Sequence, residues 1–388
     1  MKQRTPHGGY PVTFYLAFLA SFLFFSSMHL LITPLPLYIE EMGGQPSDVG
    51  LAMGSFAIAA IIARPYMGRL ADTWGRKPTL VVGAIMFVLG PLSYTIAQSV
   101  PLLLAARMFH GVGIAAFTTA YFALVVDLTP ASRWGEALGV AGVAPSVSMI
   151  LASPIGTSLT GWVSFPLIFI GAALVALSSV VIILPLQEPE KVSAAAHSEN
   201  PRGQGLLNVV RLRGVWAASL ATLAVGLTHG AVYSFLPLFA QDRGLGNVGF
   251  FFTASGIMVI LTRFLLGRVS DKVGRVPVIL PMFIILAISM AGLNWTYGFA
   301  MLLAMALING LGFGGTRVGL DTLVVDSAPG SARATALGVL YICFDSGIGA
   351  GSVLIGTLAN FTGYGNMYLL VGVACVLTMV LFAAVMQR

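Results

Sequence analysis

Residues 68–77 read GRLADTWGRK and residues 267–276 read GRVSDKVGRV, so the chain carries one short polar stretch twice. The offset is 267 − 68 = 199 positions in a chain of 388 residues. The same offset places LVVDLTPAS (124–132) on LVVDSAPGS (323–331). A constant shift over this length indicates a duplicated chain whose two halves share one orientation.

The composition places these halves in a membrane. Hydrophobic residues make up 57% of the chain and charged residues only 9%, with a mean hydropathy of +0.92; soluble domains carry about a quarter charged residues. A bilayer core requires about 20 apolar residues per helix. Twelve stretches of that kind lie near 12–38, 48–70, 79–97, 101–126, 136–160, 164–186, 214–240, 248–268, 277–294, 297–325, 334–360 and 364–386.

These stretches predict an all-α polytopic membrane protein with twelve transmembrane helices in two six-helix halves. We expect a first bundle over 1–186, a polar cytoplasmic linker over 187–213 and a second bundle over 214–388. Paired small residues such as Gly347 and Gly351 predict close helix approach, and Gly139 lies in a similar pattern.

The basic residues predict the orientation in the membrane. With the amino terminus inside, fifteen Lys and Arg residues fall on the cytoplasmic side and only Arg243 falls outside, while four more lie within spans. By the positive-inside rule, both termini are expected in the cytoplasm of a bacterial-type inner membrane. The first span is too long for a cleavable signal peptide and lacks a small-residue cleavage site.

At residues 68–77 the chain fits G-x-x-x-D-x-x-G-R-K, a signature of the major facilitator superfamily, and it resembles that family over essentially its whole length. The second copy departs from the signature at Val276, where a basic residue is usual. The stretch ARMFHGVG (106–113) resembles the R-x-x-x-G motif of proton-coupled drug and metabolite exporters. In the fifth span, SPIGTS (153–158) lacks the full glycine pattern usual in those exporters.

The resemblance implies that the repeated loop is a conformational gate and not a substrate site. Its glycines permit tight turns or close helix approach, and its acidic residues are expected to form ion pairs with the arginines. The alternative is that these basic residues only set topology and form passive ion pairs. The predicted gate residues are Gly68, Asp72, Gly75, Arg76 and Asp127 in the first half and Gly267, Asp271, Gly274, Arg275 and Asp326 in the second.

Ionisable groups inside spans are costly and are therefore functional candidates by default. Arg317 and Asp321 are four residues apart, so they can pair on one helix face, and burial disfavours a charged carboxylate, which makes Asp321 a candidate proton carrier. Arg64 and Arg263 lie one turn inside the membrane and are expected to reach its interface. The substrate or proton candidates are His29, Arg107, His110, Tyr121, His229, Tyr233, Arg317, Asp321 and Asp345.

Each of these candidates has a structural alternative, an ion pair or an interhelical hydrogen bond. Further cavity candidates are the aromatic or soft residues Phe25, Met28, Phe313 and Tyr341. The sequence contains no nucleotide-binding loop and no metal-ligand spacing, and Cys343 and Cys375 suggest no disulfide. We therefore expect no cofactor, with a proton gradient as the driving force.

These observations predict a secondary transporter that works by alternating access and exports a small anionic or zwitterionic organic solute or drug by proton antiport. The alternatives are a proton-coupled uptake symporter for a sugar or an organic anion, and a non-transporting membrane sensor or scaffold. An enzyme is not expected, since no nucleophile–base arrangement stands out. The expected partners are the solute and membrane lipid, without nucleic acid, and the protein is expected to function as a monomer.

Overall fold

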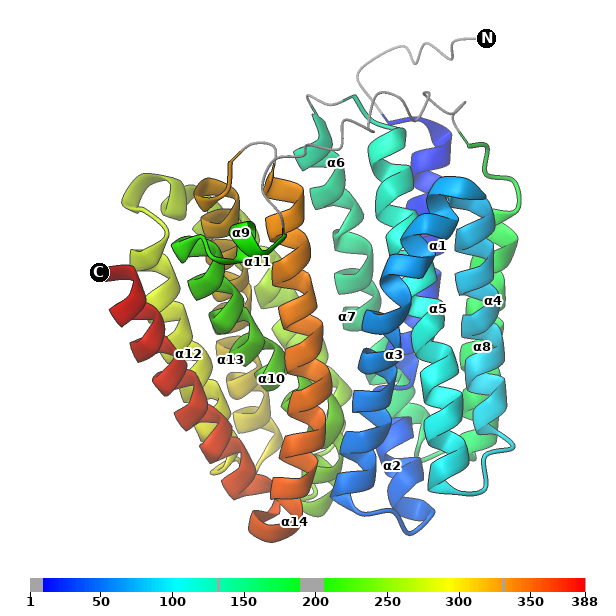
Figure 1. The fold of residues 1–388 in the computed structure, drawn as a ribbon. Helices are drawn as coiled ribbons and strands as arrows, with labels where there is room; N and C mark the ends of the chain where they lie inside the picture. The colour runs from blue at the N-terminus through cyan, green and yellow to red at the C-terminus, as the bar shows by residue number, and fades with distance from the viewer. Residues whose placement is uncertain (1–9, 131–132, 189–205, 330–331, 388) are drawn as a thin grey trace. The chain divides into compact units, whose positions relative to one another are not determined.

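The computed structural model describes residues 10–130, 133–188, 206–329 and 332–387, and its regular structure over those ranges is entirely helical (Figure 1). The helices are α1 (Val12–Leu30), α2 (Pro34–Glu41), α3 (Pro46–Thr73), α4 (Arg76–Tyr94), α5 (Val100–Asp127), α6 (Trp134–Ala141), α7 (Val143–Leu159), α8 (Phe165–Ile183), α9 (Leu206–Val210), α10 (Arg213–Asp242), α11 (Gly249–Val273), α12 (Val276–Leu293), α13 (Phe299–Ser327) and α14 (Arg333–Gln387).

Eleven helical stretches of the described chain are long and apolar enough to cross a membrane. The last of these runs over Thr335–Gln387 but contains Gly363, whose φ of 73° and ψ of 166° are not helical. A glycine tolerates this conformation because it has no Cβ. The stretch therefore holds two spans joined by a sharp turn, and the predicted fold class, an all-α polytopic membrane protein with twelve spans, is confirmed.

Two of the spans are interrupted, which the sequence pattern did not predict. The first span consists of α1 and α2, and α2 begins at Pro34, a residue that lacks the backbone N–H needed to continue a helix. The fifth span consists of α6 and α7, which are separated at Gly142. Both breaks lie inside stretches of high hydropathy, so an apolar window does not reveal them.

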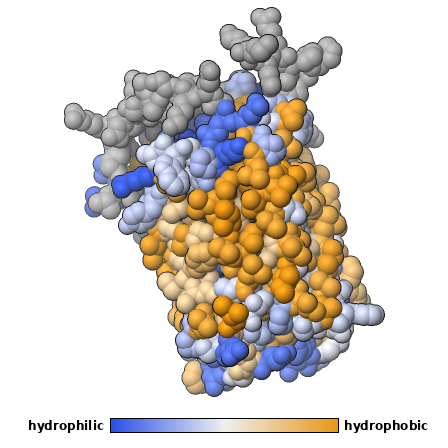
Figure 2. Space-filling model, turned by 90° about the vertical axis from the view of Figure 1, so that its right-hand side faces the viewer, coloured by the Kyte–Doolittle hydropathy of each residue, from blue (hydrophilic) through white to orange (hydrophobic). Residues whose placement is uncertain are grey.

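The outer surface carries large apolar side chains in helical register. Leu167, Leu174 and Val181 of α8 are each more than half exposed and lie seven residues apart, so they form one stripe along that helix. The face in Figure 2 is apolar over its middle and polar at its two ends. Lipid chains solvate such a belt without cost, whereas water would not.

Residue contacts divide the chain into two compact units. Unit 1 comprises residues 1–31 and 59–199, and unit 2 comprises residues 32–58 and 200–388. Helix α3 therefore contributes residues to both units. Most of the linker predicted over 187–213 falls at 189–205, outside the described residues, and the predicted boundaries of the two bundles stay a prediction.

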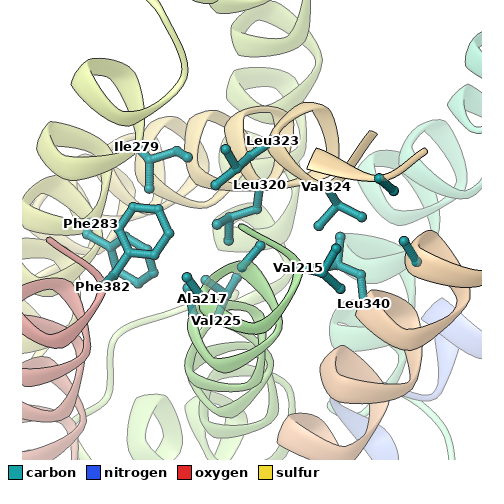
Figure 3. Packing of buried hydrophobic residues seen from close by; sticks show 14 of the residues in the cluster. Val215, Ala217, Val225, Ile279, Phe283, Leu320, Leu323, Val324, Leu340 and Phe382 are labelled. Atoms are coloured by element: carbon teal, nitrogen blue, oxygen red, sulfur yellow. The ribbon is translucent and has the colours of Figure 1, made fainter. Parts of the chain in front are cut away.

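The core of unit 2 forms where α10, α12, α13 and α14 meet (Figure 3). Val215, Phe283, Leu320 and Phe382 are buried there with aliphatic neighbours from all four helices. Close approach of α10 and α14 depends on two glycines predicted from the sequence. A Cβ at Gly347 would collide with the backbone at Leu223, and one at Gly351 would press on Leu227. Gly139, by contrast, has no neighbour within contact distance of an added Cβ in the part of the chain that the structure describes.

Unit 2 also contains a second glycine contact, between the first part of α3 and the middle of α14. A Cβ on Gly50 would meet the carbonyl oxygen of Ser352, and one on Gly356 would meet the Cα of Gly50. One turn further along, a Cβ on Gly54 would meet the side chain of Val353 and the backbone of Gly349. The two backbones therefore touch with almost no side chain between them.

Candidate functional site

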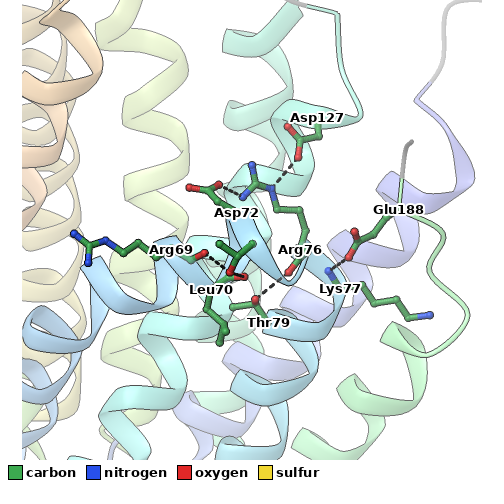
Figure 4. A network of polar contacts seen from close by, with 10 residues as sticks. Arg69, Leu70, Asp72, Arg76, Lys77, Thr79, Asp127 and Glu188 are labelled. Carbon is green, nitrogen blue, oxygen red and sulfur yellow. Dashed lines mark hydrogen bonds and ion pairs between the residues drawn. The ribbon is translucent and has the colours of Figure 1, made fainter. Parts of the chain in front are cut away.

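The repeated loop in unit 1 joins α3 to α4 through a glycine turn (Figure 4). Gly75 has a φ of 123°, a conformation that L side chains rarely adopt, and Arg76 follows as the first residue of α4. Arg76 donates from Nε to Asp127 Oδ2 at 2.9 Å and from Nη1 to Asp72 Oδ1 at 2.5 Å. One guanidinium thus ties the start of α4 to the ends of α3 and α5.

A further acidic residue, Glu188, lies against the same loop. The backbone N–H of Lys77 donates to Glu188 Oε1, and Lys77 Nζ donates to the carbonyl oxygen of Leu184 at 2.6 Å (Figure 4). A carboxylate at the amino end of α4 is favoured by the free N–H groups and the helix dipole there. Glu188 was not predicted from the sequence, because it lies 111 residues from Lys77 in the chain.

The loop in unit 2 repeats this arrangement. Gly274 has a φ of 94°, and Arg275 donates from Nε to Asp326 Oδ2 at 2.7 Å and from Nη1 to Ser270 Oγ at 3.2 Å. The side chain of Asp271 lies outside the described part of the structure. The expected pairing of an arginine with the acidic residue 51 positions later is therefore confirmed in both units.

The role of these pairs as a gate stays a prediction. Each pair lies within one unit, where it joins helix ends. Gly68, another predicted gate residue, makes at most an ordinary contact with Thr119, and Gly267 has open space around it among the described residues. Steric need for glycine is therefore limited to Gly75 and Gly274, the two turn positions.

In the interior of unit 1, two candidate residues make hydrogen bonds between helices. His29 Nδ1 lies 2.6 Å from Ser148 Oγ, which joins α1 to α7. The hydroxyl of Tyr121 donates to the carbonyl oxygen of Ala141 at 3.2 Å, which joins α5 to α6. Both side chains are buried.

Arg107 and His110 lie on α5 and meet Tyr94 of α4. Arg107 Nη1 donates to the Tyr94 hydroxyl oxygen at 3.3 Å, and that hydroxyl lies 2.6 Å from His110 Nδ1. The His110 ring packs edge-on against Phe87 and covers Gly90 so closely that a Cβ there would collide with it. Arg107 and His110 are thus brought together through Tyr94, which was not predicted from the sequence.

In unit 2, the charged pair on α13 is present. Arg317 Nη2 lies 3.2 Å from Asp321 Oδ1, although the angles are not those of a hydrogen bond. The side chain of Arg317 is 9% exposed and its Nη1 has no hydrogen-bond partner among the described residues. Its guanidinium carbon lies 4.7 Å from the ring centre of Phe344 and 5.3 Å from that of Tyr341, both on α14. These distances are those of cation–π contacts.

His229 of α10 lies in an aromatic cluster beside this pair. Its ring centre is 4.1 Å from that of Tyr233, 4.9 Å from that of Phe313 and 5.5 Å from that of Phe344. The structure therefore brings His229, Tyr233, Arg317 and Asp321 into one cluster. Asp345 is half-buried and follows Phe344 directly in α14.

Two side chains at this cluster are only partly buried. The side chain of Asp321 is 31% exposed and Tyr341 is 47% exposed, and Arg263 of α11 acts electrostatically on Asp321. Charged side chains in membrane proteins avoid lipid and face the bundle interior or water. The cluster can therefore offer a cation, a carboxylate and several aromatic rings to a solute.

The match to known families decides what kind of protein presents this arrangement. The model of the Major Facilitator Superfamily matches residues 17–251 and 246–388. The chain belongs to the major facilitator superfamily. Its members are membrane transporters and not enzymes, so the chain is a multi-pass transporter of that type.

Two relatives match much of this chain in sequence. It is 29% identical to Multidrug resistance protein 1 of Bacillus subtilis over 62% of this chain and 60% of that one. It is 20% identical to the staphylopine export protein of Staphylococcus aureus over 94% of both. Among solved structures, the nucleoside transporter NupG matches 97% of this chain and 100% of that one with a TM-score of 0.79 and 14% identity, a likeness of fold.

Proposed function

We propose that this protein is a proton-coupled exporter of small anionic or zwitterionic organic solutes that works by alternating access. It acts as a monomer in a bacterial inner membrane, with both termini in the cytoplasm. The placement of basic residues supports this orientation. Export is supported by two relatives, one named for multidrug resistance and one for export.

The observation that carries the proposal is the pair Arg317–Asp321 in the interior of unit 2. A buried ion pair is a poor source of stability, because desolvation offsets most of the attraction between the charges. A pair that also leaves Arg317 Nη1 without a hydrogen bond is better explained by a need to bind and release charge. Arg317 attracts the anionic group of the solute, and Asp321 exchanges a proton with the water that reaches it.

The experiment is flux through the purified protein in liposomes with an imposed pH gradient and a panel of anionic and zwitterionic organic solutes. Solute that moves against the direction of proton flow supports the exporter. Solute that accumulates with the protons would instead identify an uptake symporter. Flux equal to that of empty liposomes for every solute would favour a sensor or scaffold.

Two carboxylate variants locate the proton. We expect Asp321→Asn to abolish proton-driven flux while solute exchange without a gradient continues, because an amide cannot carry the proton. Asp345→Asn removes the neighbouring candidate carboxylate in the same unit and serves as the matched comparison. Full proton-driven flux in Asp321→Asn would assign the coupling to another group, and loss only in Asp345→Asn would transfer it to Asp345.

A further inference from the structure

We propose that the Arg317–Asp321 pair with its aromatic cluster is a subsite for a small aromatic zwitterion, whose carboxylate binds Arg317 and whose ammonium group binds Asp321. This inference rests on the proposed function and names its substrate class. It uses only residues of unit 2 from α10, α13 and α14.

Both charged groups of the pair have unused hydrogen-bonding capacity. Arg317 Nη1 has no hydrogen-bond partner among the described residues, and Asp321 Oδ1 makes no hydrogen bond although it lies 3.2 Å from Nη2. A guanidinium binds a carboxylate best through two parallel N–H donors. Arg317 therefore has an unused donor for a carboxylate and Asp321 an unused acceptor for an ammonium group. Both unbonded atoms are buried, so the two side chains must turn toward the solute to use them.

Charge balance selects a zwitterion over a simple ion. A monoanion that took Arg317 would leave the Asp321 carboxylate without its ion-pair partner, with only the electrostatic influence of Arg263. A monocation that took Asp321 would leave the buried Arg317 guanidinium without its anion. An unpaired buried charge is strongly unfavourable. A solute that carries both charges replaces one internal ion pair with two new ones and leaves neither group unpaired.

The aromatic cluster selects the body of the solute. Phe344 touches both parts of the site, since its ring lies 4.7 Å from the Arg317 guanidinium carbon and 5.5 Å from the His229 ring centre. Tyr233 and Phe313 complete the cluster, and Tyr341 exposes 47% of its surface beside the pair. Stacked and edge-on aromatic pairs stabilise each other beyond the burial of their area. An aromatic ring next to the charged groups of the solute can therefore stack here.

Such a site couples substrate to protons by competition. A proton that arrives from outside binds the Asp321 carboxylate, neutralises it and displaces the ammonium group, so the solute leaves on that side. Arg317 is then without an anion, and this unfavourable state favours release of the proton on the inner side. On the inner side, the ammonium group of the next solute binds Asp321 and its proton passes to water. The O–H bond of the Asp321 carboxyl group is the covalent bond that forms on the outer side and breaks on the inner side, and each cycle exchanges one solute for one proton at this carboxylate.

Probes that share one phenyl ring but differ in charge test which charge class the site prefers. L-phenylalanine is the zwitterion, 2-phenylethylamine is the cation, 3-phenylpropanoate is the anion, and L-alanine is a zwitterion without a ring. We expect purified protein in detergent at pH 7 to bind L-phenylalanine at least tenfold tighter than each of the others, as measured by calorimetry. Binding of L-phenylalanine should weaken as the pH falls from 7 to 5.

Variants test whether this preference arises at the proposed pair. Asp321→Asn should remove the preference for L-phenylalanine over 3-phenylpropanoate. Arg317→Gln should remove the preference for L-phenylalanine over 2-phenylethylamine. The double variant Arg317→Gln with Asp321→Asn removes both members of the pair, so it can be tested even if a single variant misfolds. It should bind the zwitterion, the cation and the anion without preference. Glu136→Gln, which removes an exposed ion pair with Arg133, is the control and should leave binding unchanged.

The inference is overturned if none of the probes binds, if the amine or the acid binds tightest, or if the double variant keeps the preference. Its failure differs from that of the proposed function. Proton-driven flux of another solute class would reject the zwitterion subsite and keep the exporter, whereas the expected binding pattern without flux would reject the exporter and keep the subsite.

Discussion

The motif loops of the two units form equivalent ion pairs: Arg76 Nε lies 2.9 Å from Asp127, and Arg275 Nε lies 2.7 Å from Asp326. In the helices behind these loops they differ. Thr118 of unit 1 donates its hydroxyl to the carbonyl oxygen of Ile114 in its own helix, whereas the residue 199 positions later is the charged Arg317. The loop ion pairs are common to both units, whereas the Arg317–Asp321 pair has no charged counterpart at the equivalent positions of unit 1.

The largest expected effect is on the Arg317–Asp321 pair of unit 2. Arg317→Gln removes the ion-pair partner of the Asp321 carboxylate and should lower the free energy of unfolding by about 3 kcal/mol. This value is at the lower end of the range for a broken buried pair, because Asp321 is partly exposed. Thr118→Val at the equivalent position of unit 1 should cost less than about 1 kcal/mol, since it removes one local hydrogen bond. Melting temperatures of the purified variants compare the two.

Adding Asp321→Asn to Arg317→Gln should restore most of the lost stability, because no charge is then unpaired. If Arg317→Gln melts no lower than Thr118→Val, the pair is not a costly buried charge and the contrast between the interiors is lost.

The next effect tests whether the interior of unit 1 is structural. Tyr94→Phe removes the hydroxyl that Arg107 and His110 share, and it should cost about 1–3 kcal/mol because polar groups stay buried with a lost partner. Melting temperature should fall while the dependence of flux on the pH gradient stays the same. Tyr15→Phe, at a side chain that is more than half exposed, is the control. A changed pH dependence in Tyr94→Phe would give unit 1 a part in coupling.

A smaller effect is expected at the glycine turns that the two motif loops share. Gly75→Ala and Gly274→Ala force a Cβ into backbone conformations with positive φ, at a cost of about 1–2 kcal/mol each. Gly75→Ala should be the worse of the two, because its Cβ would also meet the Glu188 carboxylate. Gly135→Ala, in open space within a helix, should be neutral or slightly stabilising. Equal melting temperatures for all three variants would contradict the turn geometry.

The smallest effect is expected at the ion pairs themselves. Arg76→Gln and Arg275→Gln should each lower stability by less than about 1 kcal/mol, since their partners are exposed. High salt should shrink both differences, because it screens exposed charges. Thermal melts in low and high salt measure this, and a large loss that salt does not change would mean that these pairs are more buried than the structure shows.

The sequence predicted those features that a repeat or a helical period encodes. The shift of 199 residues led to the pairs Arg76–Asp127 and Arg275–Asp326, and the four-residue spacing led to Arg317–Asp321. In each case the geometry follows from a rule about local spacing or about two equivalent halves. The fold class followed from hydropathy in the same way.

Contacts between distant helices did not follow from the sequence. Tyr94 as the shared partner of Arg107 and His110, Ser148 as the partner of His29, and Glu188 at the start of α4 depend on how helices pack. A helical period gives the face of a residue but not the helix opposite. The break between α1 and α2 was also missed, although Pro34 was a signal for it.

The glycine contact between α3 and α14 has a consequence for how readily helices can part. Where Gly50 meets Ser352 and Gly356, the surfaces in contact are backbone. Glycine has no rotamers to fix, so making or breaking this contact changes side-chain conformational entropy very little. The crossing therefore has no space for one added methyl group, and its glycines lose no side-chain rotamer freedom when it forms.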